Sequence, residues 1–148
     1  MVRSAVVEDL NGLFELEQQF GAEAFTKKTL RRFLSKGKNR LFVLEDAMGR
    51  MVGSAIVLRR KNSTKARLYS FIIHEKHRGA GMGSAYLRLI LERLAGKVDT
   101  VTLEVSENNE AAIRMYEACG FELDGRVEGY YRDGSAALKM HRSFQNNG

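Results

Sequence analysis

The chain has 148 residues, of which 44% are hydrophobic and 28% charged, and these values are typical of one folded domain of about 100–200 residues. The formal net charge is +6, which suits anionic partners, but the basic residues are spread along the chain and select none in particular. The single Cys119 excludes internal disulfides, and no stretch approaches the roughly 18 apolar residues of a membrane span. We therefore expect one cytoplasmic domain, residues 1–148, with no membrane partner.

The N-terminal half predicts a strand, two helices and three further strands. After the strand at Val2–Val7, apolar residues at helical spacing follow Asp9, a candidate N-terminal cap, and again follow Thr26, with Gly37 placed to end the second helix. Strands joined by connections this short cannot be parallel, so they are expected to form an antiparallel meander. These strands are Leu41–Glu45, Met51–Arg60 and Lys65–Ile73.

The C-terminal half predicts a glycine-rich loop followed by alternating helices and strands. These elements are a helix at Ser84–Ala95, a strand at Asp99–Val105, a helix near 109–118, and two strands flanking Arg132–Gly134, a hairpin signal. The resulting order is strand, helix, helix, three strands, helix, strand, helix and two strands. It predicts a single α/β (α+β) domain with a mixed, mostly antiparallel central sheet.

The loop from Arg78 to Gly83 is the strongest local motif. Helix N-terminal N–H groups have no partner within the helix and favour an anion, and glycines let the backbone approach phosphate oxygens closely. Arg78 adds a forked cationic donor at the rim. The motif predicts a pyrophosphate site, although a bare three-glycine loop also suits a flexible turn. A P-loop NTPase is excluded because Ser84-Ala85 follows Gly83, and a dinucleotide fingerprint would need a third glycine at Ser84.

Three spaced motifs together resemble the GNAT superfamily of acetyltransferases. Arg78, Gly81 and Gly83 resemble its acetyl-CoA signature. The other two motifs resemble bacterial ribosomal-protein alanine N-acetyltransferases and peptide N-terminal acetyltransferases; they comprise Leu103-Glu-Val105, Asn109–Ile113, Tyr116 and Gly120-Phe121, and then Tyr130–Gly134 with Leu138 and Met140. The resemblance covers about half of the chain. One departure is Ile73-His-Glu75, where the family often has Val-Asp-Pro.

The resemblance implies a fold, a cofactor and its binding residues. It implies helices on both faces of the sheet and a splay between the fourth and fifth strands, where the pantetheine arm of acetyl-CoA would lie. The residues that would bind the cofactor are Ile73, Arg78, Gly79, Ala80, Gly81, Met82, Gly83, Ser84 and Asn109. Tyr130 and Tyr131 would line the acceptor groove, although aromatic residues beside a hairpin can equally serve packing.

Two residues are candidates for the chemistry. By resemblance, Tyr116 would be the general acid that protonates the leaving thiolate, and Glu104 the general base, directly or through a water. The simpler interpretations are a core tyrosine and a solvated or salt-bridged carboxylate. Glu15 and Glu17 on the first helix could contact a cationic acceptor, but a solvated helix face is the simpler interpretation. Cys119 is better interpreted as a buried small residue than as a nucleophile.

The expected function is direct transfer of an acetyl group, in a ternary complex, from acetyl-CoA to a primary amine, most plainly the α-amine of a protein or peptide. The alternatives are a small amine such as a polyamine, amino acid or antibiotic, and a CoA-binding module without catalysis. No RNA-binding motif with stacking aromatics is present, so no specific nucleic acid is expected. No metal is implied because the histidines lack ligand spacing. The chain is expected to be a monomer or homodimer.

Overall fold

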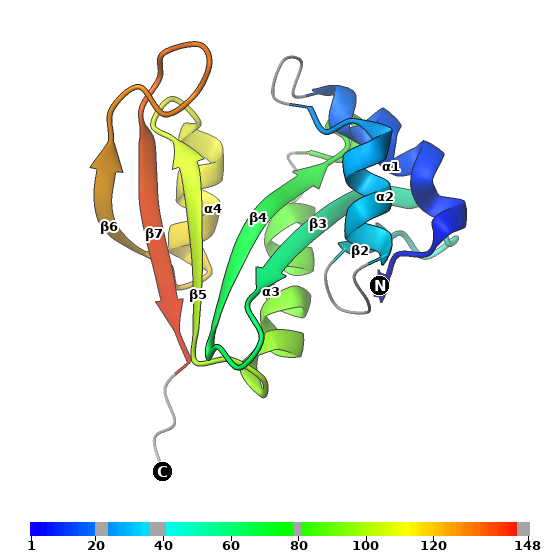
Figure 1. The fold of residues 1–148 in the computed structure, drawn as a ribbon, viewed down its shortest axis with the longest axis horizontal. Coiled ribbons are helices and arrows are strands. Elements are labelled where there is room, and N and C mark those ends of the chain that lie inside the picture. The colour runs from blue at the N-terminus through cyan, green and yellow to red at the C-terminus, as the bar shows by residue number, and fades with distance from the viewer. Residues whose placement is uncertain (20–23, 36–40, 79–80, 145–148) are drawn as a thin grey trace. The chain divides into compact units, whose positions relative to one another are not determined.

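A computed structural model describes residues 1–19, 24–35, 41–78 and 81–144, and the helices and strands in them follow the predicted order (Figure 1). The strands are β1 Val2–Ser4, β2 Leu41–Glu45, β3 Met51–Arg59, β4 Lys65–Ile73, β5 Thr100–Ser106, β6 Glu122–Val127 and β7 Ala137–Ser143. The helices are α1 Leu10–Glu17, α2 Lys27–Ser35, α3 Met82–Ala95 and α4 Glu110–Ala118, with 3-10 turns η1 Val7–Asp9 and η3 Glu75–His77. Gly37, expected to end the second helix, lies outside the described residues.

The chain forms two compact units, and β4 contributes to both. The first unit comprises Met1–Leu58 and Tyr69–Met82, and the second comprises Arg59–Leu68 and Gly83–Gly148. The strands are hydrogen-bonded in the order β1-β2-β3-β4-β5-β7-β6. None of the helices in the described part of the chain has both the length and the apolar character needed to cross a membrane.

In the first unit, β1 and β3 pair with β2 on either side, both antiparallel. Helices α1 and α2 pack on this sheet through a shared apolar core (Figure 1), whose buried members are Leu10, Leu13, Leu30, Leu41, Val43 and Ile56. Gly53 in β3 lies directly against β4, because a Cβ on it would stand 2.4 Å from the carbonyl oxygen of Ile72. Only glycine permits so close an approach of the two strands.

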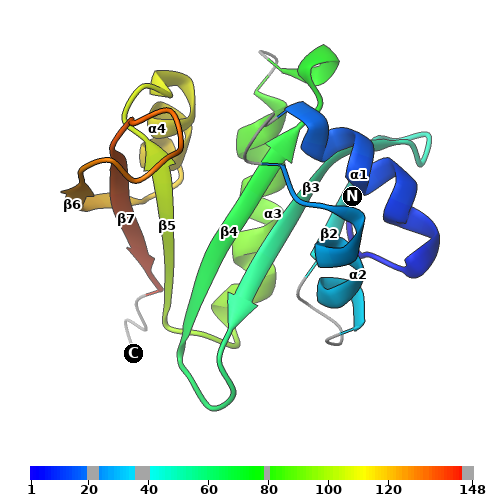
Figure 2. The same ribbon diagram turned by 45° about the horizontal axis from the view of Figure 1, so that its top comes forward.

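In the second unit, β5 lies between the start of β4 and β7. Its parallel register with β4 runs only from Lys65 with Thr100 to Arg67 with Thr102, whereas β7 pairs antiparallel with β5 along the whole of Thr100–Ser106. Strand β6 completes this part of the sheet on the other side of β7, and α4 lies behind β5 in both views (Figure 2). These pairings confirm the mixed, mostly antiparallel sheet, and the short parallel ladder agrees with the expected splay.

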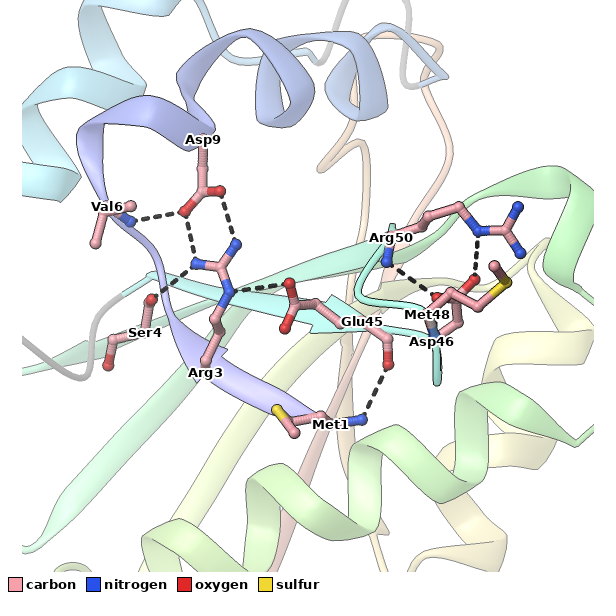
Figure 3. Close-up of polar contacts among 9 residues, drawn as sticks. All are labelled: Met1, Arg3, Ser4, Val6, Asp9, Glu45, Asp46, Met48 and Arg50. Atoms are coloured by element: carbon pink, nitrogen blue, oxygen red, sulfur yellow. Dashed lines mark hydrogen bonds and ion pairs between the residues drawn. The ribbon is translucent and has the colours of Figure 1, made fainter.

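The N-terminal segment differs from its prediction in two respects. The first strand ends at Ser4 rather than Val7, and Asp9 makes no side-chain cap on α1. Instead, both carboxylate oxygens of Asp9 accept hydrogen bonds from Arg3 at 2.8 Å, and one also accepts from the Val6 N–H (Figure 3). The same guanidinium reaches Glu45 of β2 at 3.1 Å (Figure 3). A local cap was predicted from the residue type and position of Asp9 alone, whereas in the structure its carboxylate is occupied by Arg3, six residues earlier, and by the Val6 N–H.

The predicted hairpin at Arg132–Gly134 is only partly correct. A turn is present, since the Gly134 N–H donates to the Tyr131 carbonyl at 2.9 Å and Gly134 has a positive φ of 86°. However, the strands end at Val127 and resume at Ala137, so the turn belongs to a longer connection rather than a tight hairpin. This connection also carries Tyr130 and Tyr131.

Candidate functional site

Arg78, the first residue of the glycine-rich loop, has a side chain fixed by two hydrogen bonds within the first unit. Its Nε donates to the carbonyl oxygen of Ile73 at 3.0 Å, and its Nη2 donates to Oε1 of Gln19 at 2.6 Å. Ile73 ends β4 and is buried. Two of the predicted cofactor-binding residues, Arg78 and Ile73, are therefore in direct contact. Gln19, which accepts the second hydrogen bond from Arg78, was missed by the sequence analysis.

The beginning of α3 has the features that a phosphate site requires. Gly81 adopts a positive φ of 73°, and a Cβ built on it would meet no atom within 4 Å among the described residues. Helix α3 begins at the next residue, Met82, followed by Gly83 and Ser84. The first N–H groups of a helix lack intrahelical partners, so this turn fits an anion. Gly79 and Ala80, also predicted to bind the cofactor, lie outside the described residues.

Glu104 lies on the face of β5 opposite the buried Val101, Leu103 and Val105, as strand alternation predicts. Its Oε2 accepts a hydrogen bond from Nε of Arg67 at 2.9 Å, which makes an ion pair between β4 and β5. The side chain of Glu104 is 14% exposed and that of Arg67 is 38% exposed. Glu104 is therefore a salt-bridged carboxylate, which fits the alternative interpretation, and its role as a base stays a prediction.

Arg67 also connects Glu104 to a second predicted residue. Its Nη2 donates to the hydroxyl oxygen of Tyr130 at 3.0 Å, and the ring of Tyr130 packs edge-on against Tyr131 with centroids 4.9 Å apart. Burial alone would lower the pKa of Arg67, but Glu104 and Tyr130 beside it raise that pKa overall, so the guanidinium stays charged at every working pH. Arg67 thus brings together the candidate base and the candidate acceptor-binding tyrosines. Sequence analysis missed it because strand register is needed to place it beside β5.

Tyr116 points its ring into the core of the second unit from α4. It is 8% exposed and packs edge-on against Phe121, with ring centroids 5.7 Å apart. Burial, with smaller contributions from Tyr131 and Cys119, raises the pKa of Tyr116 well above its usual value. The phenol therefore keeps its proton at neutral pH. That state suits a proton donor as well as a core tyrosine, so the catalytic role of Tyr116 stays a prediction.

Asn109 and Cys119 lie at the two ends of α4. Asn109 caps the helix, because its side-chain oxygen accepts a hydrogen bond from the Ala112 N–H at 3.2 Å. Its amide N–H groups and the second lone pair of this oxygen can still contact a cofactor. Cys119 is buried, and burial raises the pKa of its thiol although Arg88 and Arg142 nearby act in the opposite direction. This agrees with its interpretation as a buried small residue.

Glu17 does not lie on the solvated helix face that the sequence analysis preferred for it. It is 1% exposed at the end of α1, whereas Glu15 on the same helix is exposed as expected. One of its oxygens accepts a hydrogen bond from the Phe25 N–H at 3.2 Å. Burial raises the pKa of Glu17, opposed by this N–H and by the Ser70 hydroxyl. No group of three or more metal-ligating side chains was found within the part of the chain that the structure describes.

Comparison with protein families and sequences places this chain among acetyltransferases. The model of the acetyltransferase (GNAT) family matches residues 8–121, which include parts of both compact units. The chain is 31% identical over 133 residues to N-alpha-acetyltransferase RimI of Mycobacterium tuberculosis, covering 86% of this chain and 82% of that protein. It is 35% identical over 60 residues to a spermine/spermidine N(1)-acetyltransferase of Bacillus subtilis, covering 39% of this chain and 40% of that protein. The chain also spans only 45% of the N-alpha-acetyltransferase 30 of Xenopus laevis that it matches.

Solved structures with the same fold include two proteins of similar length. One is Ard1 from Thermoplasma volcanium, with a TM-score of 0.87 and 26% identity over 99% of this chain and 98% of that chain. The other is the ribosomal-protein-S18-alanine N-acetyltransferase from Escherichia coli, with a TM-score of 0.84 and 28% identity over 100% of this chain and 96% of that chain.

Proposed function

The chain belongs to the acetyltransferase (GNAT) family, and on this basis we propose that it transfers an acetyl group from acetyl-CoA to the α-amine of a protein or peptide. The observation that carries the proposal is the contact of Arg67 with both Glu104 and Tyr130, which joins the candidate base to a candidate acceptor-binding residue. The similarity to a RimI protein along most of both chains supports the same acceptor class.

Acetyl-CoA supplies the activated acetyl thioester and a pyrophosphate by which it can be held. The residues proposed to hold it are Ile73, Arg78, Gly79, Ala80, Gly81, Met82, Gly83, Ser84 and Asn109. The open left-handed turn at Gly81 supports this assignment, as does the start of α3, whose first N–H groups have no partner within the helix. Asn109 would take part through its amide N–H groups or the second lone pair of its oxygen, which also caps α4.

Two side chains are proposed to move protons. Glu104 accepts a proton from the acceptor amine, directly or through a water, as the nitrogen bonds to the acetyl carbon. When the carbon–sulfur bond breaks, Tyr116 donates its phenolic proton to the leaving sulfur. Tyr116 is protonated at neutral pH, as a proton donor must be, but its raised pKa makes it a weaker acid, so the role rests on the resemblance and not on the pKa. Transfer is direct, in a ternary complex, and Tyr130 and Tyr131 contact the acceptor.

The α-amine suits this arrangement better than a lysine side chain. A free α-amine has a pKa near 8, whereas a lysine has one near 10.4, so at neutral pH the α-amine needs far less help to lose its proton. A small amine is the second candidate acceptor, favoured by the similarity of part of the chain to a spermine/spermidine acetyltransferase. One domain over residues 1–148, a cytoplasmic location, a monomeric or homodimeric state and the absence of a metal, a specific nucleic-acid partner and a membrane partner stay predictions.

The test is release of the CoA thiol from acetyl-CoA, followed with a thiol reagent. One set of acceptors is peptides with free N-termini, the second is the same peptides with blocked N-termini, and the third is small amines. We expect release with free peptides only. Turnover with small amines alone would move the acceptor to the second candidate. Tight acetyl-CoA binding with no turnover in any set would favour a CoA-binding module without catalysis.

The substitution Glu104→Gln tests the proposed base. We expect kcat with a peptide acceptor to fall about tenfold at pH 7, which is less than general bases usually contribute because the α-amine titrates near pH 8. The loss should shrink as the pH rises above 8, since the amine then loses its proton unaided. Glu107→Gln, on a half-buried residue of the same segment paired with Arg126, is the matched control. An E104Q enzyme with the wild-type pH–rate profile would exclude Glu104 as the base.

A further inference from the structure

The guanidinium of Arg67 occupies the position that a cationic acceptor must approach if Glu104 is to serve as its base. We infer that Arg67 determines acceptor specificity: it admits an amine whose neighbouring atoms include oxygen acceptors and disfavours a polycationic amine. The inference rests on the proposed function and deepens it, because it explains which of the two candidate acceptor classes the site selects.

The first step of the argument is the charge around Glu104. Arg67 pairs with it from β4, and Lys139 is its direct partner in the antiparallel register with β7. Side chains directly opposite in an antiparallel pair have Cβ atoms about 4.5–5.5 Å apart, so one carboxylate is flanked by two cations. Nearby carboxylates have their own partners: Glu107 and Glu128 pair with Arg126, and Asp124 contacts His141. The immediate surroundings of Glu104 are therefore positive.

The second step is what Arg67 requires when an acceptor arrives. An amine that approaches Glu104 competes with Arg67 for the same carboxylate. The guanidinium is partly buried and has only donors, so it then needs replacement oxygen acceptors. A peptide N-terminus brings carbonyl oxygens, and it can bring a side-chain hydroxyl or carboxylate. A polyamine brings only further donors and positive charges, so it offers Arg67 no replacement for the Glu104 carboxylate and repels the guanidinium.

The third step is that two different nitrogens of the Arg67 guanidinium each donate a hydrogen bond. Nε binds Glu104 at 2.9 Å while Nη2 binds the hydroxyl of Tyr130 at 3.0 Å. The Tyr130 bond is available whether or not Glu104 is engaged with an acceptor. It therefore keeps the charge beside the carboxylate. Arg67 is thus a fixed feature of the acceptor site rather than a side chain that can simply swing into solvent.

The experiment measures kcat/KM for spermidine and for two peptides that differ only in a glutamate or a lysine at their second position. In the wild-type enzyme we expect the glutamate peptide to be preferred to the lysine peptide, and both to spermidine. Arg67→Gln should lower the ratio of peptide to spermidine kcat/KM about tenfold, with KM rising for the peptide and falling for spermidine. Arg67→Lys keeps the charge and should preserve most of the ratio.

Lys65→Gln is the matched control, because it removes the same charge two residues earlier on the same face of β4. It should leave the ratio unchanged. A merely structural role for Arg67 would lower kcat/KM for every acceptor together, so an unchanged ratio in R67Q overturns the inference while the proposed function stands. A wild-type enzyme that prefers spermidine to free peptides overturns both. A wild-type enzyme that acetylates peptides but ignores the second position overturns the inference alone.

Discussion

Two arginines in different compact units make the same kind of contact with different surroundings. In the first unit, Arg3 of β1 binds both oxygens of Asp9 at 2.8 Å and also reaches Glu45 at 3.1 Å (Figure 3). In the second unit, Arg67 of β4 binds one carboxylate, Glu104, and the hydroxyl of Tyr130. Arg3 therefore has two carboxylate partners. Arg67 has one, Glu104, which also has a second cation, Lys139, as its direct partner across the sheet.

The two arginines differ in the segments of the chain that they connect. Arg3 ties the first strand to the start of α1 and to β2, all of them elements of the scaffold. Arg67 ties a candidate catalytic carboxylate to a loop that carries two aromatic residues. The two ion pairs are alike in geometry, so their roles must be inferred from their neighbours. We expect changes near Arg3 to alter stability and leave the rate unaffected, and changes near Arg67 and α4 to alter the rate.

The largest expected effect is that of Tyr116→Phe in the second unit. Loss of the phenolic proton donor should lower kcat about 100-fold, equivalent to roughly 2.7 kcal/mol in the barrier, with acetyl-CoA affinity retained. The phenylalanine ring keeps the packing against Phe121, so the unfolding transition should move little. Steady-state kinetics, acetyl-CoA titration and urea denaturation of the same preparations separate these effects. Tyr86→Phe, at a buried tyrosine of α3, is a control that removes a hydroxyl from the same unit.

An unchanged kcat in Y116F would remove Tyr116 from the chemistry and favour the simpler interpretation of a core tyrosine. A parallel loss of kcat and stability would indicate that the hydroxyl supports the fold. Either result would weaken the division between a scaffold region and a catalytic region, because Tyr116 is as deeply buried as many core residues.

The sequence predicted the order of elements, the face of β5 and the position of the helix after the glycine-rich loop because these depend on local patterns. Alternation along β5 placed Glu104 opposite the buried Val101 and Leu103, as the structure confirms. Contacts between distant segments could not be predicted. Arg67 meets Glu104 only through the register of a short parallel ladder. Asp9 was given a local cap because its residue type favours one, and the sequence does not show that the turn after β1 brings Arg3 back onto its carboxylate.

The second prediction concerns Asp9→Asn in the first unit. Hydrogen bonds from Arg3, aided by the Val6 N–H and opposed by burial, lower the pKa of Asp9 below its ordinary 3.8. Because the folded pKa is depressed, this contribution to stability is fully present above about pH 3.8 and is lost as the pH falls through the folded value. We expect D9N to lose about 1.5 kcal/mol in the free energy of unfolding at pH 7. Urea denaturation at pH 7 and at pH 3 should show the deficit shrinking with acid, while kcat stays unchanged.

Asp46→Asn is the matched control for Asp9. Asp46 also pairs with an arginine, but the side chain of Arg50 is 70% exposed, and asparagine can keep the turn by accepting from the Met48 and Arg50 N–H groups (Figure 3). Exposed pairs contribute little, so D46N should destabilise less than D9N. Equal losses in the two variants would show that burial of the Arg3 pair adds nothing.

The smallest expected effect, of opposite sign, is that of Glu17→Gln at the other end of α1. Burial raises the pKa of Glu17 above its ordinary 4.5, so the ionised carboxylate costs stability, and this cost appears as the pH rises from about 4.5 through the folded value. The amide removes the charge and can still accept from the Phe25 N–H. E17Q should therefore gain about 1 kcal/mol or less at pH 7 and nothing at pH 4, by urea denaturation. Glu15→Gln, on the exposed face of the same helix, should change neither value. A loss of stability in E17Q at pH 7 would mean that the buried charge of Glu17 is compensated as fully as that of Asp9. Both carboxylates would then be stabilising, whereas we expect Asp9 to stabilise the fold and Glu17 to destabilise it.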